Sequence, residues 1–399
     1  MTEDDSKALY QNLSLGLLAV AILAAGAAVA QAFGRFAYGL LLPAIRDDLG
    51  ITNTFAGLIG GANVGAYLLG TMLVAYATSR FRLLAVLRTG LLLGTLGLGL
   101  AAYANSPYLL MLAVFITGIG GACVWIPAPI VAADALPATK RGLAVGALSS
   151  GIGIGVSFVS LLGGQLRAET GDSAWSNVYG VLATLALLVL VLLQGLVRHQ
   201  QEKPSGGAGI GGFAALVRMP GWKPFLSTYT IFGFMYYLVI GFLTTRLEDD
   251  SGWSSVDASF GFTLMGVAMI FGGPLLIAVA ARLGVRRTSV LAFFLWPVAV
   301  LIVLSGLPLP TLIACTTLGL LFSGIPTLMT LYVVANTTAQ DYGPSFAAGT
   351  LAFGIAQMIS PPIGGLLADV SGSFFLVFLL SALMGGLGLV ASLNFVDKT

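Results

Sequence analysis

Arg35 is an arginine inside an otherwise apolar segment, AQAFGRFAYGLLLPAIRDDLG, which runs from Ala30 to Gly50. On a helix, Gln31 (four residues before) and Tyr38 (three residues after) share the face of Arg35. The three side chains offer a guanidinium, an amide and a phenol. Because a guanidinium binds two oxygens of a carboxylate or phosphate through parallel hydrogen bonds, this set predicts an anion-binding site.

The positions of the Asp and Glu residues support the prediction of an anion-binding site at Arg35. All 16 Asp and Glu residues fall at the N-terminus, in predicted loops or at the ends of predicted helices. An arginine at the centre of a membrane helix costs about 2.5 to 3.5 kcal/mol, so Arg35 should face a wet cavity or a partner. An anionic substrate would supply the missing counter-charge. The alternatives are a structural clamp, in which Arg35 bonds backbone carbonyls or snorkels toward the outer water, and a gate element.

Amide and aromatic side chains near the middle of other predicted helices are further candidates for a substrate pocket, although aromatic side chains also commonly pack between helices. These candidates are Asn63, Tyr67, Trp125, Tyr236, Tyr237, Tyr332 and Gln357.

Charged residues at the predicted cytoplasmic helix ends are candidates for a gate whose ion pairs break when the two halves move apart. They are Asp134, Arg141, Arg80, Arg82 and Arg282. The alternative is the ordinary excess of positive charge on the cytoplasmic side of membrane proteins.

The elements that must position these residues are membrane-spanning helices. Of 399 residues, 57% are hydrophobic and 9% are charged, whereas soluble domains carry roughly 25% charged residues. Runs of about 20 apolar residues, long enough to cross a bilayer as a helix, recur along the chain. The sequence predicts an all-α membrane protein with twelve spans, at 14–45, 55–78, 83–104, 107–135, 142–166, 174–197, 225–246, 258–281, 288–306, 310–336, 344–369 and 372–395.

The distribution of positive charge predicts the orientation. With the N-terminus in the cytoplasm, 14 of the 18 Lys and Arg residues lie on the cytoplasmic side, Arg46, Arg167 and Arg246 lie outside, and Arg35 lies within the membrane. This bias is typical of multi-pass proteins of the cytoplasmic (inner) membrane. Both termini are therefore expected in the cytoplasm.

A repeat divides the chain into two halves. The polar, glycine-rich stretch RHQQEKPSGGAGIGG, within the predicted linker 198–224, separates residues 1–197 from residues 225–399. Phe33-Gly34 and Tyr38 match Phe232-Gly233 and Tyr237 at an offset of 199 residues. Two parallel six-helix halves, related by a pseudo-two-fold axis along the membrane normal, are an architecture of alternating-access transporters.

Several motifs resemble those of the major facilitator superfamily. The segments Gly70–Leu84 and Gly273–Leu291 are similar to the G-x-L-a-D-r-x-G-r-r loop of the superfamily, although both lack its acidic residue. DALPATKRG at Asp134–Gly142 resembles the ending of the fourth span, and SPPIGG at Ser360–Gly365 is close to a glycine–proline motif of its antiporters. The first span is most similar to the YbfB/YjiJ-type branch. The resemblance implies the major facilitator fold, and organic-phosphate antiporters of the superfamily place an anion-binding arginine near the position of Arg35.

These observations favour a secondary or facilitative transporter that moves a small, carboxylate-like organic anion, with proton or counter-substrate coupling left open. Efflux of hydrophobic drug-like compounds is an alternative, favoured by 10% aromatic residues and ten methionines. A non-transporting membrane receptor is a second alternative. The expected partners are the substrate and the lipid bilayer, and the chain is expected to act as a monomer.

The chain offers little material for catalysis. Cys123 and Cys315 lie in apolar runs and His199 is the single histidine, so neither a metal site nor histidine-based catalysis is expected. No G-x-x-x-x-G-K-[ST] phosphate-binding loop occurs in the sequence. We therefore expect no enzyme activity, no cofactor and no nucleic-acid partner.

Overall fold

The computed structural model describes residues 3–197 and 212–396, and at residues 3–12 and 339 it describes the backbone alone. The described part contains twelve helices long and apolar enough to cross a membrane. All twelve predicted spans are confirmed, with ends that differ from the prediction by a few residues. Residues 198–211 of the predicted linker lie outside the described residues.

The first half of the chain forms six spans. They are built from α1 (Glu3–Ala27), η1 (Ala28–Phe36) and α2 (Ala37–Leu49); α3 (Asn53–Thr78); α4 (Leu83–Ala102); α5 (Pro107–Trp125) with α6 (Ala128–Asp134); η2 (Ala138–Lys140) with α7 (Arg141–Thr170); and η3 (Asp172–Ala174) with α8 (Trp175–Leu196).

The second half begins with a short helix and then forms six more spans. The elements are α9 (Gly212–Arg218); α10 (Trp222–Thr245) with η4 (Arg246–Asp250); α11 (Ser255–Leu283); α12 (Val285–Leu304); α13 (Pro308–Asn336); α14 (Ala339–Ser371); and α15 (Phe375–Ser392).

Local sequence explains where several of these helices begin and end. The Thr52 side chain caps α3 by accepting a hydrogen bond from the N–H of Phe55, and Ser106 and Ser254 cap α5 and α11 in the same way. The first span ends at Gly50, whose φ of 60° is a left-handed conformation that glycine adopts without strain. Tight connections of this kind make successive spans antiparallel neighbours.

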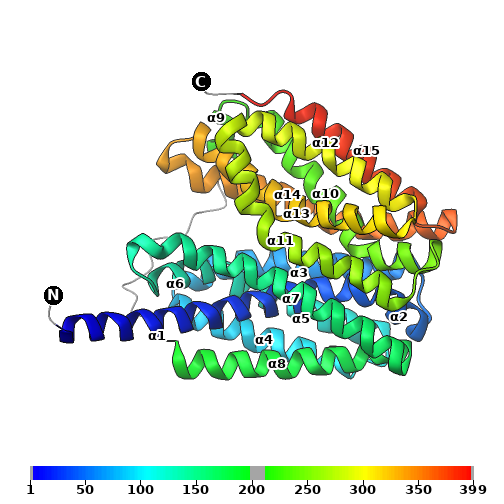
Figure 1. Cartoon of the computed structure of the whole chain (residues 1–399), viewed down its shortest axis with the longest axis horizontal. Helices are drawn as coiled ribbons and strands as arrows, with labels where there is room; N and C mark the ends of the chain where they lie inside the picture. Colours follow the sequence, from blue (N-terminus) through cyan, green and yellow to red (C-terminus); the bar gives the residue numbers. More distant parts are fainter. Residues whose placement is uncertain (1–2, 198–211, 397–399) are drawn as a thin grey trace.

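The two halves contact each other through symmetry-related helices (Figure 1). The most extensive contacts between them join α3 to α14 and α7 to α11. Helices α3 and α14 are spans two and eleven, and α7 and α11 are spans five and eight. Each helix of one contact therefore corresponds to the helix six spans away in the other contact. The predicted pseudo-two-fold arrangement of two six-helix halves is thereby confirmed.

The halves meet at one end of the bundle and diverge at the other (Figure 1). We call the end that carries both described chain ends the terminal face, and the opposite end, with the connections after α2, α4 and α10, the distal face. Glycines allow the backbones of the two halves to touch toward the distal face. A Cβ added at Gly57 would overlap the Pro361 carbonyl oxygen, and one added at Gly39 would lie 2.5 Å from the Ile240 carbonyl oxygen.

At the terminal face, residues of α7 are open to their surroundings. Leu143 is 61% exposed, and a Cβ added at Gly142 or Gly146 would have no other atom within 4 Å. The structure is therefore closed at the distal face and more open at the terminal face.

The first span departs from the regular α-helix that we expected. Residues Ala28–Phe36 form a π-helical segment, and the N–H of Ala37 donates to the carbonyl of Ala32, five residues earlier. Such segments replace the i→i+4 hydrogen bond with an i→i+5 bond, and they often occur at functional sites. This segment contains both Gln31 and Arg35.

Candidate functional site

The π-helical segment η1 positions the central arginine. Arg35 lies at its end, and the Arg35 Nη1 atom donates to Gln31 Oε1 at 3.5 Å. The Gln31 side chain is buried, so this bond fixes one side of the guanidinium inside the protein.

Asn63 and Thr117 hold the backbone beside Arg35. The Asn63 Nδ2 atom lies 3.0 Å from the Gly34 carbonyl oxygen and 2.7 Å from the Val114 carbonyl oxygen. The Thr117 hydroxyl also donates to the Gly34 carbonyl, at 2.9 Å. Asn63 therefore ties α3, α5 and η1 together, and in this structure it positions Arg35 rather than presenting its amide to a pocket.

Two tyrosine rings flank the guanidinium of Arg35. Its Cζ atom lies 5.1 Å from the ring centre of Tyr67 on α3 and 5.6 Å from that of Tyr237 on α10. Both distances are in the cation–π range. Because α3 and α10 belong to different halves, Arg35 lies at the interface that must change if the halves move.

Two donors on one edge of the Arg35 guanidinium make no hydrogen bond to the described residues, although the Tyr237 side chain interacts with Arg35. Its Nε and Nη2 atoms are buried and make no hydrogen bond in the described structure. These two donors point in the same direction and form the fork that matches the two oxygens of a carboxylate. Buried donors without partners are costly, by about 1 to 3 kcal/mol each or more for a charged group, so this edge calls for a partner that the described side chains do not supply.

Tyr38 also lies beside Arg35, as its spacing predicted. Its hydroxyl donates to the Ala56 carbonyl at 2.8 Å. Arg35, Tyr38, Tyr237 and Pro361 line a common cavity of about 10 Å³, which is large enough for about one water molecule. The cavity includes residues of both halves.

The remaining predicted pocket residues divide into two groups. Tyr236 lies near Arg35, since its ring is 5.8 Å from that of Tyr237. Gln357 lies on α14 between Phe353, whose ring is 5.7 Å from that of Tyr236, and Pro361 of the small cavity. Spacings of four residues place all three α14 side chains on one helix face, toward Arg35.

Tyr332 and Trp125 lie farther toward the terminal face. The Tyr332 ring packs 4.3 Å from that of Phe395, and its hydroxyl lies 3.4 Å from the Gly221 carbonyl at the start of α10. The structure thus gives Tyr332 a packing position away from Arg35. Trp125 is half-buried at the last residue of α5, one turn after Gly121, where an added Cβ would approach Ala30 and Tyr67.

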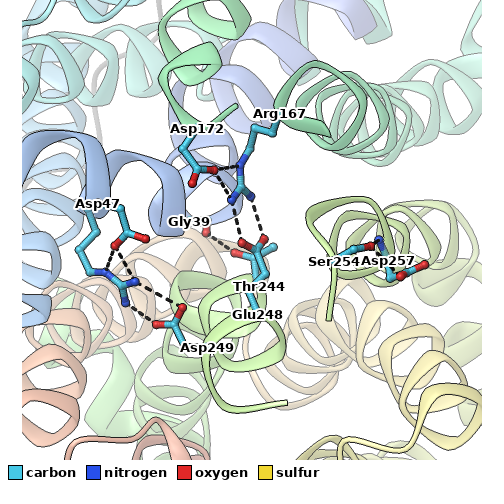
Figure 2. Close-up of polar contacts among 10 residues, drawn as sticks. Gly39, Asp47, Arg167, Asp172, Thr244, Glu248, Asp249, Ser254 and Asp257 are labelled. Carbon is cyan, nitrogen blue, oxygen red and sulfur yellow. Dashed lines mark hydrogen bonds and ion pairs between the residues drawn. The ribbon is translucent and has the colours of Figure 1, made fainter. Parts of the chain in front are cut away.

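Ion pairs join the two halves at the distal face (Figure 2). In the sequence, these charged residues indicated only on which side of the membrane the helix ends lie. Arg167 on α7 donates from Nη1 and Nη2 to both carboxylate oxygens of Glu248, each at 2.7 Å, and contacts Asp172 at 2.8 Å. Arg46 on α2 pairs with Asp249. We call Arg46, Arg167, Glu248 and Asp249 the distal latch.

A helix cap strengthens the same closure. The Asp369 carboxylate, at the distal end of α14, accepts hydrogen bonds from the N–H groups of Asn53 and Thr54 at 3.0 and 2.8 Å. These N–H groups begin α3 in the other half, where an anion also interacts favourably with the helix dipole. The sequence showed that acidic residues and three arginines concentrate at the distal helix ends. It did not show which acid pairs with which arginine.

A model of one protein family matches residues 27–393, almost the whole chain, and is described as "Uncharacterised MFS-type transporter YbfB". The chain belongs to this family of major facilitator superfamily transporters. Its function is therefore transport of the major facilitator type, and it is not an enzyme. The resemblance seen in the sequence motifs is confirmed.

Several characterised and uncharacterised transporters are similar to this one. The uncharacterised MFS-type transporter YfhI of Bacillus subtilis is 25% identical over 88% of this chain and 87% of its own length. The sialic acid transporter NanX of Escherichia coli is 24% identical, covering 84% of this chain and 81% of its own. The hexuronate transporter of B. subtilis is 26% identical, covering 92% and 91%.

A solved structure supports the fold of the transporter. The crystal structure of the bacterial homologue of the lysosomal transporter Spinster, described as inward-facing and unoccupied, has a TM-score of 0.77 at 15% identity and covers 97% of this chain and 99% of that one. At this identity the likeness concerns the fold alone.

The predicted gate residues of this transporter lie at the terminal face. Asp134 and Arg141, within one half, approach to 3.8 Å and are both exposed, and Arg80 stacks on Tyr76 at 4.4 Å. Arg82 and Arg282 are exposed at helix ends. Their role as a gate stays a prediction for the state in which the terminal face closes.

The distal latch leads to a stability prediction for the transporter. Arg167 and Glu248 have side chains that are 4% and 13% exposed, so Arg167→Met leaves a buried carboxylate without its main partner. We expect a loss of about 3 to 5 kcal/mol for the distally closed state, seen as a lower melting temperature. Removing both charges, in Arg167→Met with Glu248→Leu, should recover most of the loss.

An exposed arginine provides the control for this experiment. Arg287→Met changes a solvent-exposed residue of α12 and should leave the melting temperature unchanged. Equal melting temperatures for Arg167→Met and the unsubstituted protein would show that the pair does not stabilise this state.

Proposed function

We propose that this chain is a secondary transporter that carries a small organic anion across the cytoplasmic membrane by alternating access, as a monomer with both termini in the cytoplasm. The excess of Lys and Arg at the terminal face supports this orientation. In it, the structure corresponds to the state closed to the outside and more open to the cytoplasm.

The observation that carries the proposal is the vacant edge of Arg35. Its Nε and Nη2 atoms are buried without partners, while Nη1 is held by Gln31. If Arg35 were a structural clamp, its Nε and Nη2 atoms would donate hydrogen bonds to backbone carbonyls. A carboxylate that binds these two atoms neutralises the arginine and satisfies both donors in one step. Two relatives are named as transporters of acids, a sialic acid and a hexuronate, which supports an acidic substrate.

The site is suited to alternating access because it contains groups of both halves. Arg35 and Tyr67 belong to the first half, and Tyr237 belongs to the second. A bound anion would thus contact both halves and could favour a state in which they close around it. The distal latch would have to break before the anion reached the outside, so its ion pairs set part of the free-energy difference between the two states.

A binding screen tests the proposal. Purified full-length protein would be heated with matched carboxylates, organic phosphates and neutral alcohols or amides of similar shape. We expect carboxylates to raise the melting temperature, and the same compounds to exchange across proteoliposomes. Stabilisation by the neutral compounds and none by the anions would overturn the proposal.

Efflux of hydrophobic compounds is a second candidate, because the structure contains an apolar groove between α3, α5 and α14. The groove has a volume of about 860 Å³ and is lined by side chains such as Leu69, Met72, Phe115 and Ile355. It would receive an apolar compound directly from the lipid. A resistance panel in a host without its own pumps separates the two functions, since an organic-anion carrier should not protect against neutral hydrophobic drugs.

A further inference from the structure

Aromatic side chains of both halves gather in the region of Arg35. Tyr67, Phe322 and Phe353, from α3, α13 and α14, are each partly exposed. Behind them lies the buried Tyr236, whose ring is 5.0 Å from that of Phe322 and 5.7 Å from that of Phe353. Tyr67 contacts the guanidinium directly, and Phe322 and Phe353 lie one ring farther out, against Tyr236.

A second side chain with an unpartnered donor, Gln357, comes from the other half of the protein. The Gln357 side chain is 2% exposed, and its Nε2 atom makes no hydrogen bond in the described structure. It lies one turn from Phe353, which faces Tyr236, and one turn from Pro361, which lines the small cavity with Arg35. An acceptor atom on a bound molecule would satisfy this amide.

The charge of the site limits the charge of its ligand. Arg35 is the one arginine or lysine that the topology leaves within the membrane, since the other basic residues lie at span ends and connections. Its free edge can satisfy one carboxylate. A second carboxylate on the same ligand would be buried without a counter-charge, which is strongly unfavourable.

The polarity of the walls limits the body of the ligand. A sugar acid carries several hydroxyl groups, and each one that loses water without gaining a partner costs about 1 to 3 kcal/mol. Ring faces cannot satisfy such groups, whereas they stack favourably on a planar aromatic body.

From these features we infer that the substrate is an aromatic monocarboxylate that carries an acceptor oxygen on its body. The carboxylate binds Nε and Nη2 of Arg35, the ring packs against Tyr67, Phe322 and Phe353, and the acceptor oxygen receives a hydrogen bond from Gln357. This inference rests on the proposed function, because it assigns a substrate class to the same anion site. It differs from the sugar acids named for two of the relatives.

Four small probes test the substrate class on purified full-length protein by calorimetry. They are 4-hydroxybenzoate, benzoate without the acceptor oxygen, terephthalate with a second carboxylate, and glucuronate with a polyhydroxylated body. We expect 4-hydroxybenzoate to bind at least about tenfold more tightly than terephthalate or glucuronate, and several-fold more tightly than benzoate.

Variants then assign the contacts. Phe353→Leu should weaken 4-hydroxybenzoate binding about 3- to 10-fold, and Gln357→Leu should remove its advantage over benzoate. Phe271→Leu is the matched control, because Phe271 is 58% exposed on α11, a helix that carries none of these site residues, and it should leave binding unchanged.

The outcomes separate this inference from the proposed function. If glucuronate binds at least as tightly as 4-hydroxybenzoate and its binding is lost in Arg35→Gln, the aromatic substrate class is wrong while the anion function stands. If no probe binds and Arg35→Gln behaves like the unsubstituted protein in every assay, both fail. The probe series with unsubstituted protein decides the substrate class even if a variant does not fold.

Discussion

Arg35→Gln is expected to abolish substrate binding and transport while leaving the fold intact. The substitution removes the charge and both donors of the vacant edge, Nε and Nη2. Hydrogen bonds to a charged group contribute about 1.5 to 3 kcal/mol each, so losing two weakens anion binding by about 100-fold or more. Equilibrium binding and counterflow in proteoliposomes measure this loss.

Arg35→Lys separates charge from geometry. Lysine keeps the positive charge but lacks the planar fork that binds two oxygens at once. We expect a smaller loss than in Arg35→Gln, on the order of tenfold. A purely electrostatic role for Arg35 would instead give near-normal binding with lysine.

The control must remove an arginine without touching the site. Arg287 is exposed near the start of α12, and Arg287→Gln should retain full substrate binding. Unchanged binding in Arg35→Gln, with transport also intact, would assign Arg35 a structural role and remove the main support for an anionic substrate.

The fold was largely predictable because membrane spans are marked by composition. A bilayer requires about 20 apolar residues per helix, and the twelve predicted spans agree with the observed helices to within a few residues. The 199-residue offset between Tyr38 and Tyr237 also has a structural counterpart, since both residues line the small cavity beside Arg35. Both signals arise from local patterns that survive in a single sequence.

The site was predictable only in part, because side-chain direction depends on helix phase and on neighbours. Helical spacing correctly brought Gln31, Arg35 and Tyr38 together, although the π-helical segment was not visible in the sequence. Asn63 was predicted to line a pocket, but its side chain bonds the Gly34 carbonyl. The sequence alone does not show that this carbonyl lacks a backbone partner, because that depends on the folded structure.

The distal latch was missed for a different reason. Arg167 and Glu248 are 81 residues apart, and Arg46 and Asp249 are 203 residues apart. Each charge alone is an ordinary helix-end residue, and only the approach of α7 and α2 to η4 makes partners of them. Long-range pairing of this kind requires the tertiary structure.

Gly57→Val is expected to hold the distal face open and stop transport. Gly57 on α3 lies against the backbone of α14, where an added Cβ would overlap the Pro361 carbonyl oxygen. A backbone atom cannot move aside as a flexible side chain can, and overpacking costs about 1 to 3 kcal/mol or more. In the proposed alternating-access cycle, opening of the distal face separates this contact, so the cost should shift the population toward distal opening about 5- to 150-fold.

Spin labels report this shift directly. Tyr103 and Val256 are 85% and 43% exposed on the distal face, in different halves, and cysteines placed there can be labelled once Cys123 and Cys315 are replaced by alanine. We expect the distance between the labels to increase in Gly57→Val. Gly99→Ala is the matched control, since a Cβ at Gly99 has no atom within 4 Å. An unchanged distance together with normal transport would mean that the α3–α14 contact does not limit distal opening.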